Sequence, residues 1–145
     1  MQYGLDKSAR IMVIKLDAGE KVAASLKAIF EKEGIRSAMI LSGIGMLSEF
    51  DIGYFDGRSH RPQAFTTSHE LTSMTGSLAY VDGKPMIHIH ATLANAGQAV
   101  VGGHLGEGTV GVLAEITVAV LDAVELGRKK NERTGLFEMT IGTRQ

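Results

Sequence analysis

The fold of this chain is indicated most clearly by residues 70–93, ELTSMTGSLAYVDGKPMIHIHATL. Two strand-like runs, Glu70–Val81 and Pro85–Leu93, flank Asp82-Gly83, and an Asp-Gly pair between two such runs is a strong signal for a β-hairpin. Side chains two residues apart on a strand point to the same face, so His88 and His90 project together. The sequence therefore predicts a hairpin whose return strand presents two imidazoles side by side.

One long helix is expected before this hairpin. Asp17 lies three residues before Glu20, which resembles a capping box with Asp17 as the N-cap. Apolar residues follow at helical spacing and Gly34 is a typical stop, so the helix is expected over Ala18–Glu33. Apolar, alternating or β-branched runs predict further strands over Ile11–Leu16, Ser37–Leu41, Leu47–Phe55, Val110–Leu126 and Gly135–Ile141.

The remaining segments carry weaker signals. Ser42-Gly43-Ile44-Gly45 is expected to end the strand before it, and Arg58–Thr67 is a looser stretch. Asn95–Gly108 is expected to be a glycine-rich loop or a short helix. One long N-terminal helix, short helices and about seven mostly antiparallel strands give an α+β fold, and the length of 145 residues predicts a single domain over residues 1–145.

The composition restricts the classes of function. A net charge of −1 argues against a protein whose main task is to grip nucleic-acid phosphates, and Arg128-Lys129-Lys130 is interpreted as a solvated turn. Because the chain has no cysteine, a metal would need nitrogen or oxygen ligands. The sequence has no run apolar enough to span a membrane, and Met1–Arg10 lacks the apolar segment of a secretory signal, so a cytoplasmic location is expected.

Three of the five histidines, His88, His90 and His104, fall within seventeen residues. His104 lies in Gly102-Gly103-His104-Leu105, where the glycines let the backbone approach closely. Three imidazoles together would hold zinc with one open position, the layout that lowers the pKa of a bound water to about 7. Iron, manganese, cobalt or nickel suits the same ligands. The alternative is that these histidines are polar residues on the solvent face of an amphipathic strand.

Two carboxylates are candidates for a catalytic acid–base role. Glu115 stands in an apolar run, and Glu70 follows His69 at the start of a predicted strand. Either residue would act as a metal ligand, as a partner of a histidine or as a general acid or base if it faced the histidines. Either would otherwise be an exposed strand residue. His69 and His60 are interpreted as structural or surface residues.

Four segments in order resemble the plant-and-prokaryote conserved domain, called PPC: 40–45 (ILSGIG), 70–78 (ELTSMTGSL), 88–91 (HIHA) and 101–105 (VGGHL). The resemblance covers about Arg10 to Leu126. It implies a single α+β domain with helices packed on a largely antiparallel sheet, and it implies homotrimers. Plant members generally lack the histidines found here at positions 88, 90 and 104, so these three resemble a prokaryotic-type metal site.

Two functional hypotheses result. The first is a homotrimer with a three-histidine metal site, zinc foremost, that binds or hydrolyses a small molecule. The second is a non-enzymatic assembly or DNA-associated module, since the family's plant members carry AT-hook motifs and its prokaryotic members are described as predicted DNA-binding proteins. The AT-hook core is Arg-Gly-Arg-Pro, and this chain holds only the fragments Gly57-Arg58 and Arg61-Pro62. DNA as a partner is therefore supported by the resemblance alone.

Overall fold

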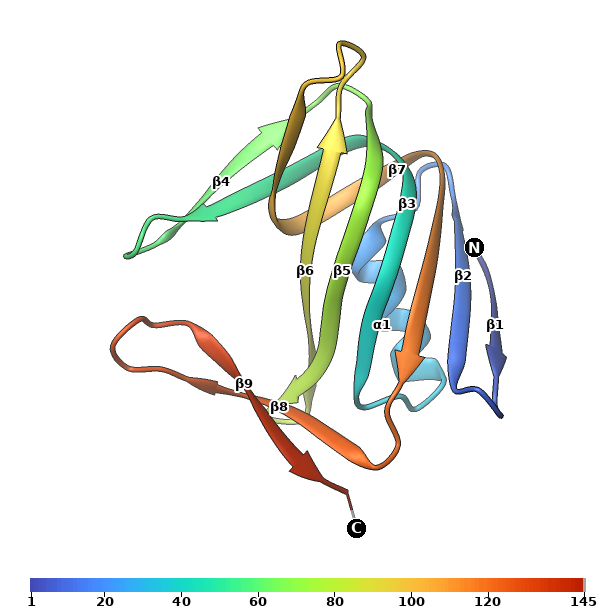
Figure 1. Cartoon of the computed structure of the whole chain (residues 1–145), viewed down its shortest axis with the longest axis vertical. Helices are drawn as coiled ribbons and strands as arrows, with labels where there is room; N and C mark the ends of the chain where they lie inside the picture. Colours follow the sequence, from blue (N-terminus) through green and yellow to red (C-terminus); the bar gives the residue numbers. More distant parts are fainter. Residues whose placement is uncertain (145) are drawn as a thin grey trace.

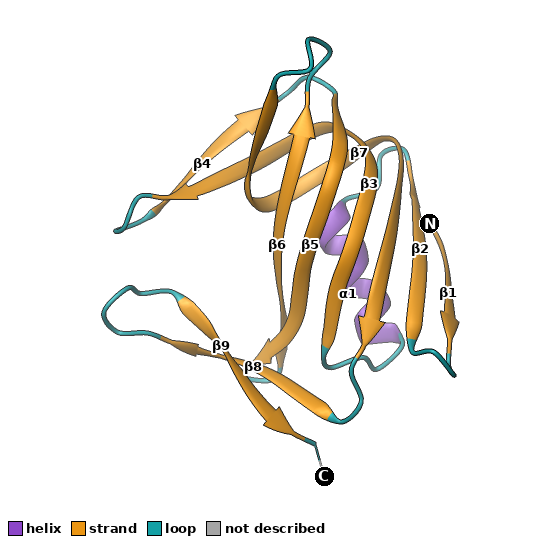
Figure 2. Cartoon of the chain, viewed as in Figure 1, coloured by secondary structure: helices purple, strands orange, loops and turns teal. Residues whose placement is uncertain are grey.

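One helix packs on a strongly twisted sheet in the computed structural model, which describes residues 1–144 (Figure 1, Figure 2). In chain order the elements are β1 (Gln2–Asp6), β2 (Ile11–Asp17), α1 (Val22–Lys32), β3 (Ala38–Phe55), β4 (His60–Phe65), β5 (His69–Val81), β6 (Lys84–Ala94), β7 (Val100–Val120), β8 (Val124–Lys130) and β9 (Phe137–Thr143). The strands lie in the order β1-β2-β7-β3-β5-β8-β9, with β4 beside β3 and with β6 between β5 and β7. All pairs are antiparallel except a short parallel contact between Tyr80 and Gly127.

The core lies between α1 and one face of this sheet. Apolar residues at helical spacing give α1 a buried stripe, and alternate residues of β2 and β7 face it. The fully buried side chains of these three elements include Met12, Ile14, Leu16, Leu26, Ile29, Phe30, Ile116 and Val118. Each such large apolar side chain contributes about 1.5–3 kcal/mol when it is removed from water. The opposite face of the sheet has no helix on it among the described residues (Figure 2).

The predicted hairpin is confirmed and the expected helix start is wrong. Strands β5 and β6 pair in antiparallel register, and Asp82 and Gly83 have the positive φ angles of a tight hairpin turn. Helix α1 begins at Val22 instead of Ala18, and its N-cap residue Lys21 makes no side-chain capping bond. The helix is instead capped from 84 residues away, because the Glu107 carboxylate accepts hydrogen bonds from the Ala23 N–H (2.8 Å) and the Ala24 N–H (3.1 Å).

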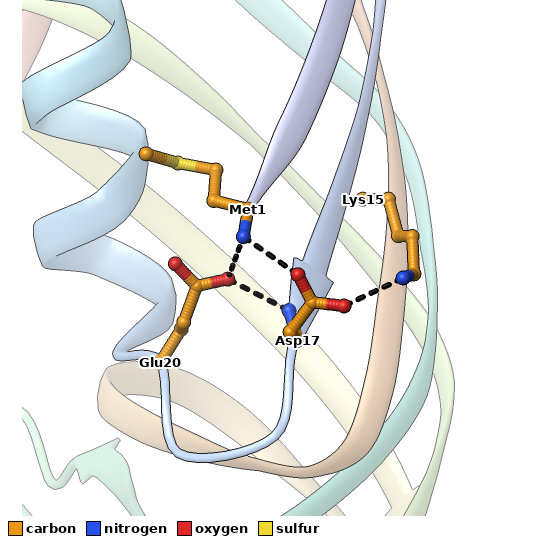
Figure 3. Close-up of polar contacts among 4 residues, drawn as sticks. All are labelled: Met1, Lys15, Asp17 and Glu20. Atoms are coloured by element: carbon orange, nitrogen blue, oxygen red, sulfur yellow. Dashed lines mark hydrogen bonds and ion pairs between the residues drawn. The ribbon is translucent and has the colours of Figure 1, made fainter.

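The two acidic residues expected to cap the helix form a charge cluster with the chain terminus (Figure 3). The amino group of Met1 lies 2.6 Å from Asp17 and 2.9 Å from Glu20, and Lys15 lies 2.5 Å from Asp17. Glu20 also accepts a hydrogen bond of 2.7 Å from the Asp17 N–H. Both carboxylates therefore have partners outside α1, and neither caps the first turn of the helix.

Residues 1–144 form nine strands instead of about seven, even though two of the predicted strands are one continuous strand, because glycines serve close packing where a turn was expected. Ser42-Gly43-Ile44-Gly45 does not end a strand, since β3 runs through it with register shifts against β7. Gly45 has φ +146, and a Cβ at this position would collide with the backbone of Leu113. Likewise, the second half of Asn95–Gly108 is the start of β7, not a loop or short helix.

Further elements were missed because their signals are weak. Strand β1 and strand β4 lie in stretches that the sequence leaves unassigned, and Val110–Leu126 divides into the end of β7 and the start of β8. Arg128-Lys129-Lys130 is part of β8, not a turn. Short helices are absent from residues 1–144, and α1, with 11 residues, leaves no helix of this stretch long and apolar enough to cross a membrane.

Candidate metal centre

Strand pairing brings His88, His90 and His104 together. In β6, Ile89 is 2% exposed and points into the core, so its neighbours His88 and His90 point to the opposite face. In β7, His104 is directly paired with His90. The imidazole centroids are 5.0 Å apart for His88 and His90, 5.0 Å for His88 and His104, and 5.7 Å for His90 and His104. The three residues can offer one nitrogen each with all three nitrogens within 4.8 Å of one another.

Glycines let the backbone bring these strands close enough. Gly103, directly before His104, has φ +154, and a Cβ there would lie 2.6 Å from the carbonyl oxygen of Gly53 on β3. Gly76 lies beside His88 in the register of β5 and β6, and a Cβ at Gly76 would collide with the His88 carbonyl oxygen. The glycine cluster that the sequence places before His104 therefore permits a close strand crossing instead of a loop.

Burial favours the neutral form of His88 and His104, which is the form of histidine that binds a metal. Burial lowers the pKa of His88 from 6.5 to about 4, and the nearby charge of Arg128 adds to this effect. Burial, followed by the proximity of His60, also lowers the pKa of His104. The Nδ1 atom of His104 is buried with no hydrogen-bond partner among the described residues. A metal ion needs deprotonated nitrogen donors, so this donor set fits a divalent transition metal.

The three histidines open into a cavity of about 520 Å³. It lies between the end of β3 with β4 on one side and the β8–β9 hairpin on the other, two arms that extend from the same side of the sheet (Figure 1). Its lining residues are Phe55, His60, Met86, Ile87, His88, His90, His104, Arg128, Gly135, Leu136 and Phe137. This lining contains no carboxylate. The cavity is large enough for a small organic molecule.

Sequence reasoning missed two residues of this cavity. His60, interpreted as structural or as a surface residue, stacks at a tilt on His104 with ring centroids 5.1 Å apart. Arg128, interpreted as part of a solvated turn, lies on β8 and donates a hydrogen bond of 2.8 Å to the Ser77 hydroxyl. In the structure Arg128 lies two residues after the buried Leu126 on the same face of β8, but the strand predicted from the sequence ended at Leu126, so Arg128 was not placed on it.

The structure does not bring Glu70 and Glu115 to the histidines. Glu70 is exposed and is paired with Ala94, which is four residues and thus about 13 Å beyond His90 along β6. Glu115 is exposed on β7 opposite Lys15 and Ile44, and β3 and β5 separate it from β6, a distance of about 14 Å across the sheet. Their acid–base role stays a prediction.

His69 has a structural environment. It is buried, its Nδ1 lies 2.8 Å from the Thr67 carbonyl oxygen, and its ring packs edge-on against Phe50 and Phe65. These contacts account for both its burial and one of its ring nitrogens, which agrees with the interpretation of His69 as a structural residue.

A model of the Plants and Prokaryotes Conserved (PCC, also written PPC) domain matches residues 3–122. This chain belongs to that family. The predicted resemblance is therefore confirmed, and the match begins a few residues before, and ends a few residues before, the predicted range of about Arg10 to Leu126.

Several solved structures of similar length match almost the entire chain. A plant- and prokaryote-conserved protein from Pyrococcus horikoshii is 34% identical, with a TM-score of 0.82 and 94% of each chain covered. A metal-containing protein from Archaeoglobus fulgidus is 30% identical, with a TM-score of 0.84 and 96% of each chain covered. A protein from Ralstonia eutropha JMP134, described provisionally as DNA-binding, is 31% identical, with a TM-score of 0.85 over 95% of this chain and 94% of that one.

Two curated relatives are much longer than this chain. Both are named bifunctional protein GlmU, from two Synechococcus strains, and are 27% and 26% identical over 135 residues. The match covers 92% of this chain, which spans about a fifth of the length of these relatives (20% and 21%). A stretch similar to this chain therefore forms one part of those longer proteins.

Proposed function

We propose that this chain is a homotrimeric PPC-domain protein that holds a divalent transition metal, zinc foremost, with His88, His90 and His104, and that binds or hydrolyses a small molecule beside it. The observation that carries this proposal is the convergence of three imidazoles, with ligand nitrogens within 4.8 Å of one another, at the wall of a cavity of about 520 Å³. The description of the Archaeoglobus fulgidus relative as metal-containing supports it further.

Three groups of residues would have different roles at such a site. The three histidines supply the ligand nitrogens, and the apolar side chains Phe55, Met86 and Phe137 keep water away from part of the cavity. Arg128 supplies a fixed positive charge. When bound, a metal with three nitrogen ligands and an open position acts as a Lewis acid toward an oxygen atom of the bound molecule. The predicted acid–base role of Glu70 and Glu115 belongs to the same proposal.

The bare face of the sheet supports assembly with further copies of the chain. Val13, Leu41 and Ile44 are 56%, 50% and 51% exposed on strands β2 and β3, where a single subunit leaves them in water. Apolar side chains grouped on one sheet face are typical of an interface. Light scattering is expected to give three times the mass of one chain, and Ile44→Glu is expected to shift the mass toward that of one chain. A monomeric wild-type protein would contradict the proposed trimer.

Metal analysis by inductively coupled plasma mass spectrometry tests the proposed centre. Untagged wild-type protein, expressed with zinc and iron available, is expected to carry about one metal per chain, and the double variant His88→Ala/His104→Ala is expected to carry none. The matched control Asp17→Asn/Glu20→Gln also removes two titratable side chains, at the cluster in Figure 3, and is expected to keep the metal. Metal-free wild-type protein would overturn the proposal.

Loaded protein then allows a screen for hydrolysis of esters, lactones and phosphoesters. Glu70→Gln and Glu115→Gln, which keep the size of each side chain, test the predicted acid–base role. If either carboxylate takes part, its variant loses turnover at unchanged metal content. Full turnover in both variants would remove these residues from the proposed mechanism.

DNA binding is the second candidate, supported by the description given to the Ralstonia eutropha relative. It requires an affinity for duplex DNA that falls steeply as salt rises, because phosphate contacts release counterions. Titration of labelled duplex at low and at physiological salt measures this directly. Absence of binding at low salt would exclude it.

A further inference from the structure

Arg128 is the positively charged residue of the cavity lining, and within residues 1–144 it has no negatively charged partner. Its guanidinium donates to the Ser77 hydroxyl (2.8 Å) and to the Phe137 carbonyl oxygen (3.3 Å), and its Nε is buried with no hydrogen-bond partner among these residues. Arg10 and Arg61, by contrast, form ion pairs with carboxylates. Within residues 1–144 no carboxylate lies within ion-pairing distance of Arg128. This half-buried cation thus makes only neutral contacts.

The environment of Arg128 favours the binding of an anionic ligand. Burial of an unpaired charge is unfavourable, and burial lowers the pKa of this guanidinium. The cavity lining holds no aspartate or glutamate. A metal ion at the histidines would add further positive charge on the same side. An anionic ligand would satisfy the charge of Arg128, which neutral contacts cannot do.

The shape and chemistry of the walls narrow the class of anion. Side chains of Phe55, Met86, Ile87, Leu136 and Phe137 line the cavity beside Arg128. These apolar walls fit a hydrocarbon or aromatic body, and the volume of about 520 Å³ fits a molecule of moderate size. A single planar guanidinium, with its parallel N–H donors, matches the two oxygens of a carboxylate. The lining holds no second arginine or lysine that would match the additional negative charge of a phosphate group.

We propose that this cavity selects small organic carboxylates with an apolar body, and that Arg128 is the residue that recognises the carboxylate. The apolar body packs against the walls between the two arms of the fold, and the part of the molecule nearest the carboxylate faces the three histidines. This names the ligand class of the proposed metal centre and rests on that proposal for the role of the metal, whereas the contact with Arg128 does not require a metal.

Calorimetric titration with three probes tests the proposal on wild-type protein. Hexanoate has both the charge and the apolar body, hexanamide is its neutral analogue, and acetate lacks the body. Hexanoate is expected to bind about 10- to 100-fold more tightly than hexanamide, as charge-assisted hydrogen bonds allow. It is also expected to bind more tightly than acetate. Equal affinities for hexanoate and hexanamide would overturn the proposal without any variant.

Variants then assign the effect to one side chain. Arg128→Met removes the charge at similar length and is expected to weaken hexanoate binding about 10- to 100-fold while leaving hexanamide unchanged. Lys129→Met removes a charge from the adjacent, exposed residue of β8 and serves as the matched control. Ser77→Ala removes the hydrogen bond to Arg128 but keeps its charge, and is expected to change affinity only a few-fold. Wild-type hexanoate affinity in Arg128→Met would overturn the assignment.

Metal content measured on the same samples separates this proposal from the proposed function. Metal-loaded protein that does not distinguish hexanoate from hexanamide retains the metal centre and overturns the carboxylate site. Metal-free protein that still prefers hexanoate, and loses the preference in Arg128→Met, overturns the metal centre and retains the carboxylate site.

Discussion

Two clusters of titratable groups in this protein differ in how their polar atoms are satisfied. In the charge cluster of Met1, Lys15, Asp17 and Glu20, two positive and two negative groups contact one another at 2.5–2.9 Å (Figure 3). In the histidine centre, three side chains converge without an ion pair to any other residue of the described part of the chain, and the buried Nδ1 of His104 has no hydrogen bond there. The first cluster is complete as it stands, whereas the second has donor atoms that only a ligand can use.

The same contrast appears in what shifts the pKa values. In the charge cluster, hydrogen bonds from Lys15 and from the chain terminus lower the pKa of Asp17 to about 2, which stabilises its charged form. At the histidine centre, burial lowers the pKa of His88, which stabilises its neutral form. Attraction between opposite charges therefore accounts for the lowered pKa of Asp17. Burial accounts for the lowered pKa of His88, which leaves its imidazole uncharged and able to donate an electron pair to a metal.

The largest expected effect that separates the clusters is stabilisation by metal. Zinc added at about 100 times its dissociation constant is expected to add about 2.7 kcal/mol to the free energy of unfolding, which raises the melting temperature by roughly 5–10 °C. His88→Ala/His104→Ala is expected to abolish this increase, and Asp17→Asn/Glu20→Gln to retain it. Thermal scans with zinc and with a chelator measure the difference. An equal increase in both double variants would show that zinc acts elsewhere.

The next effect concerns the backbone that supports the histidine centre. Gly76→Ala places a Cβ against the His88 carbonyl oxygen, so β5 and β6 must separate and His88 must move. We expect a loss of about 1–3 kcal/mol in stability and metal affinity weakened about 10-fold or more. Denaturant unfolding and competition with a metal chelator measure the two changes.

Gly4→Ala is the matched control for this substitution. Gly4 also lies in a strand, its φ is not positive, and a Cβ there meets nothing within 4 Å. This variant is therefore expected to keep both stability and metal affinity near their wild-type values. Identical losses in Gly4→Ala and Gly76→Ala would mean that the effect comes from the loss of glycine itself and not from the contact with His88.

In the metal-free protein, His88 and Asp17 are expected to change the free energy of unfolding over different ranges of pH. His88 has a pKa of about 4 in the folded protein against 6.5 ordinarily, so the unfolded chain binds the proton first. Its contribution is complete above pH 6.5 and is lost as the pH falls toward 4. Asp17 has a pKa of about 2 against 3.8, so its contribution is lost only between pH 3.8 and 2.

Unfolding by denaturant at closely spaced pH values measures both windows. His88→Gln is expected to flatten the slope between pH 6.5 and 4, and Asp17→Asn the slope below pH 4. The lowered pKa of His104 adds to the first window and leaves part of the slope in place. A His88→Gln slope equal to that of the wild type would contradict a buried, neutral His88.

The parts of the fold that could be predicted from the sequence are those determined by residues close together in the chain. The hairpin that carries His88 and His90 was predictable, because Asp82-Gly83 and the alternation around Ile89 are local patterns. The continuity of β3 through Gly43 and Gly45 was not, because the need for glycine at position 45 comes from contact with Leu113, 68 positions away. The capping of α1 by Glu107 is equally distant in sequence.

The site followed the same rule. The three histidines were identified as a group, and the structure places them together, but His60 and Arg128 enter the cavity on the two arms, whose positions no local pattern reveals. Glu115 was chosen because a carboxylate in an apolar run needs a partner or water, and Glu70 because it follows His69 at the start of the hairpin strand beside the histidines. Both side chains are exposed, so water can solvate their carboxylates, and their acid–base role stays a prediction.

The smallest expected effect is that of Asp17→Asn alone. Asp17 contacts both the Met1 amino group and Lys15, but these groups are substantially exposed, and exposed ion pairs contribute little to stability because water and salt screen them. We expect the melting temperature near pH 7 to change by no more than about 2 °C, and by less as salt rises. Metal content is expected to stay at the wild-type value, since the pairing of this cluster uses none of the atoms that converge at His88, His90 and His104. A loss of metal in Asp17→Asn would mean that the N-terminal strands control the geometry of β6 and β7, and the two clusters would then have to be treated as one coupled system.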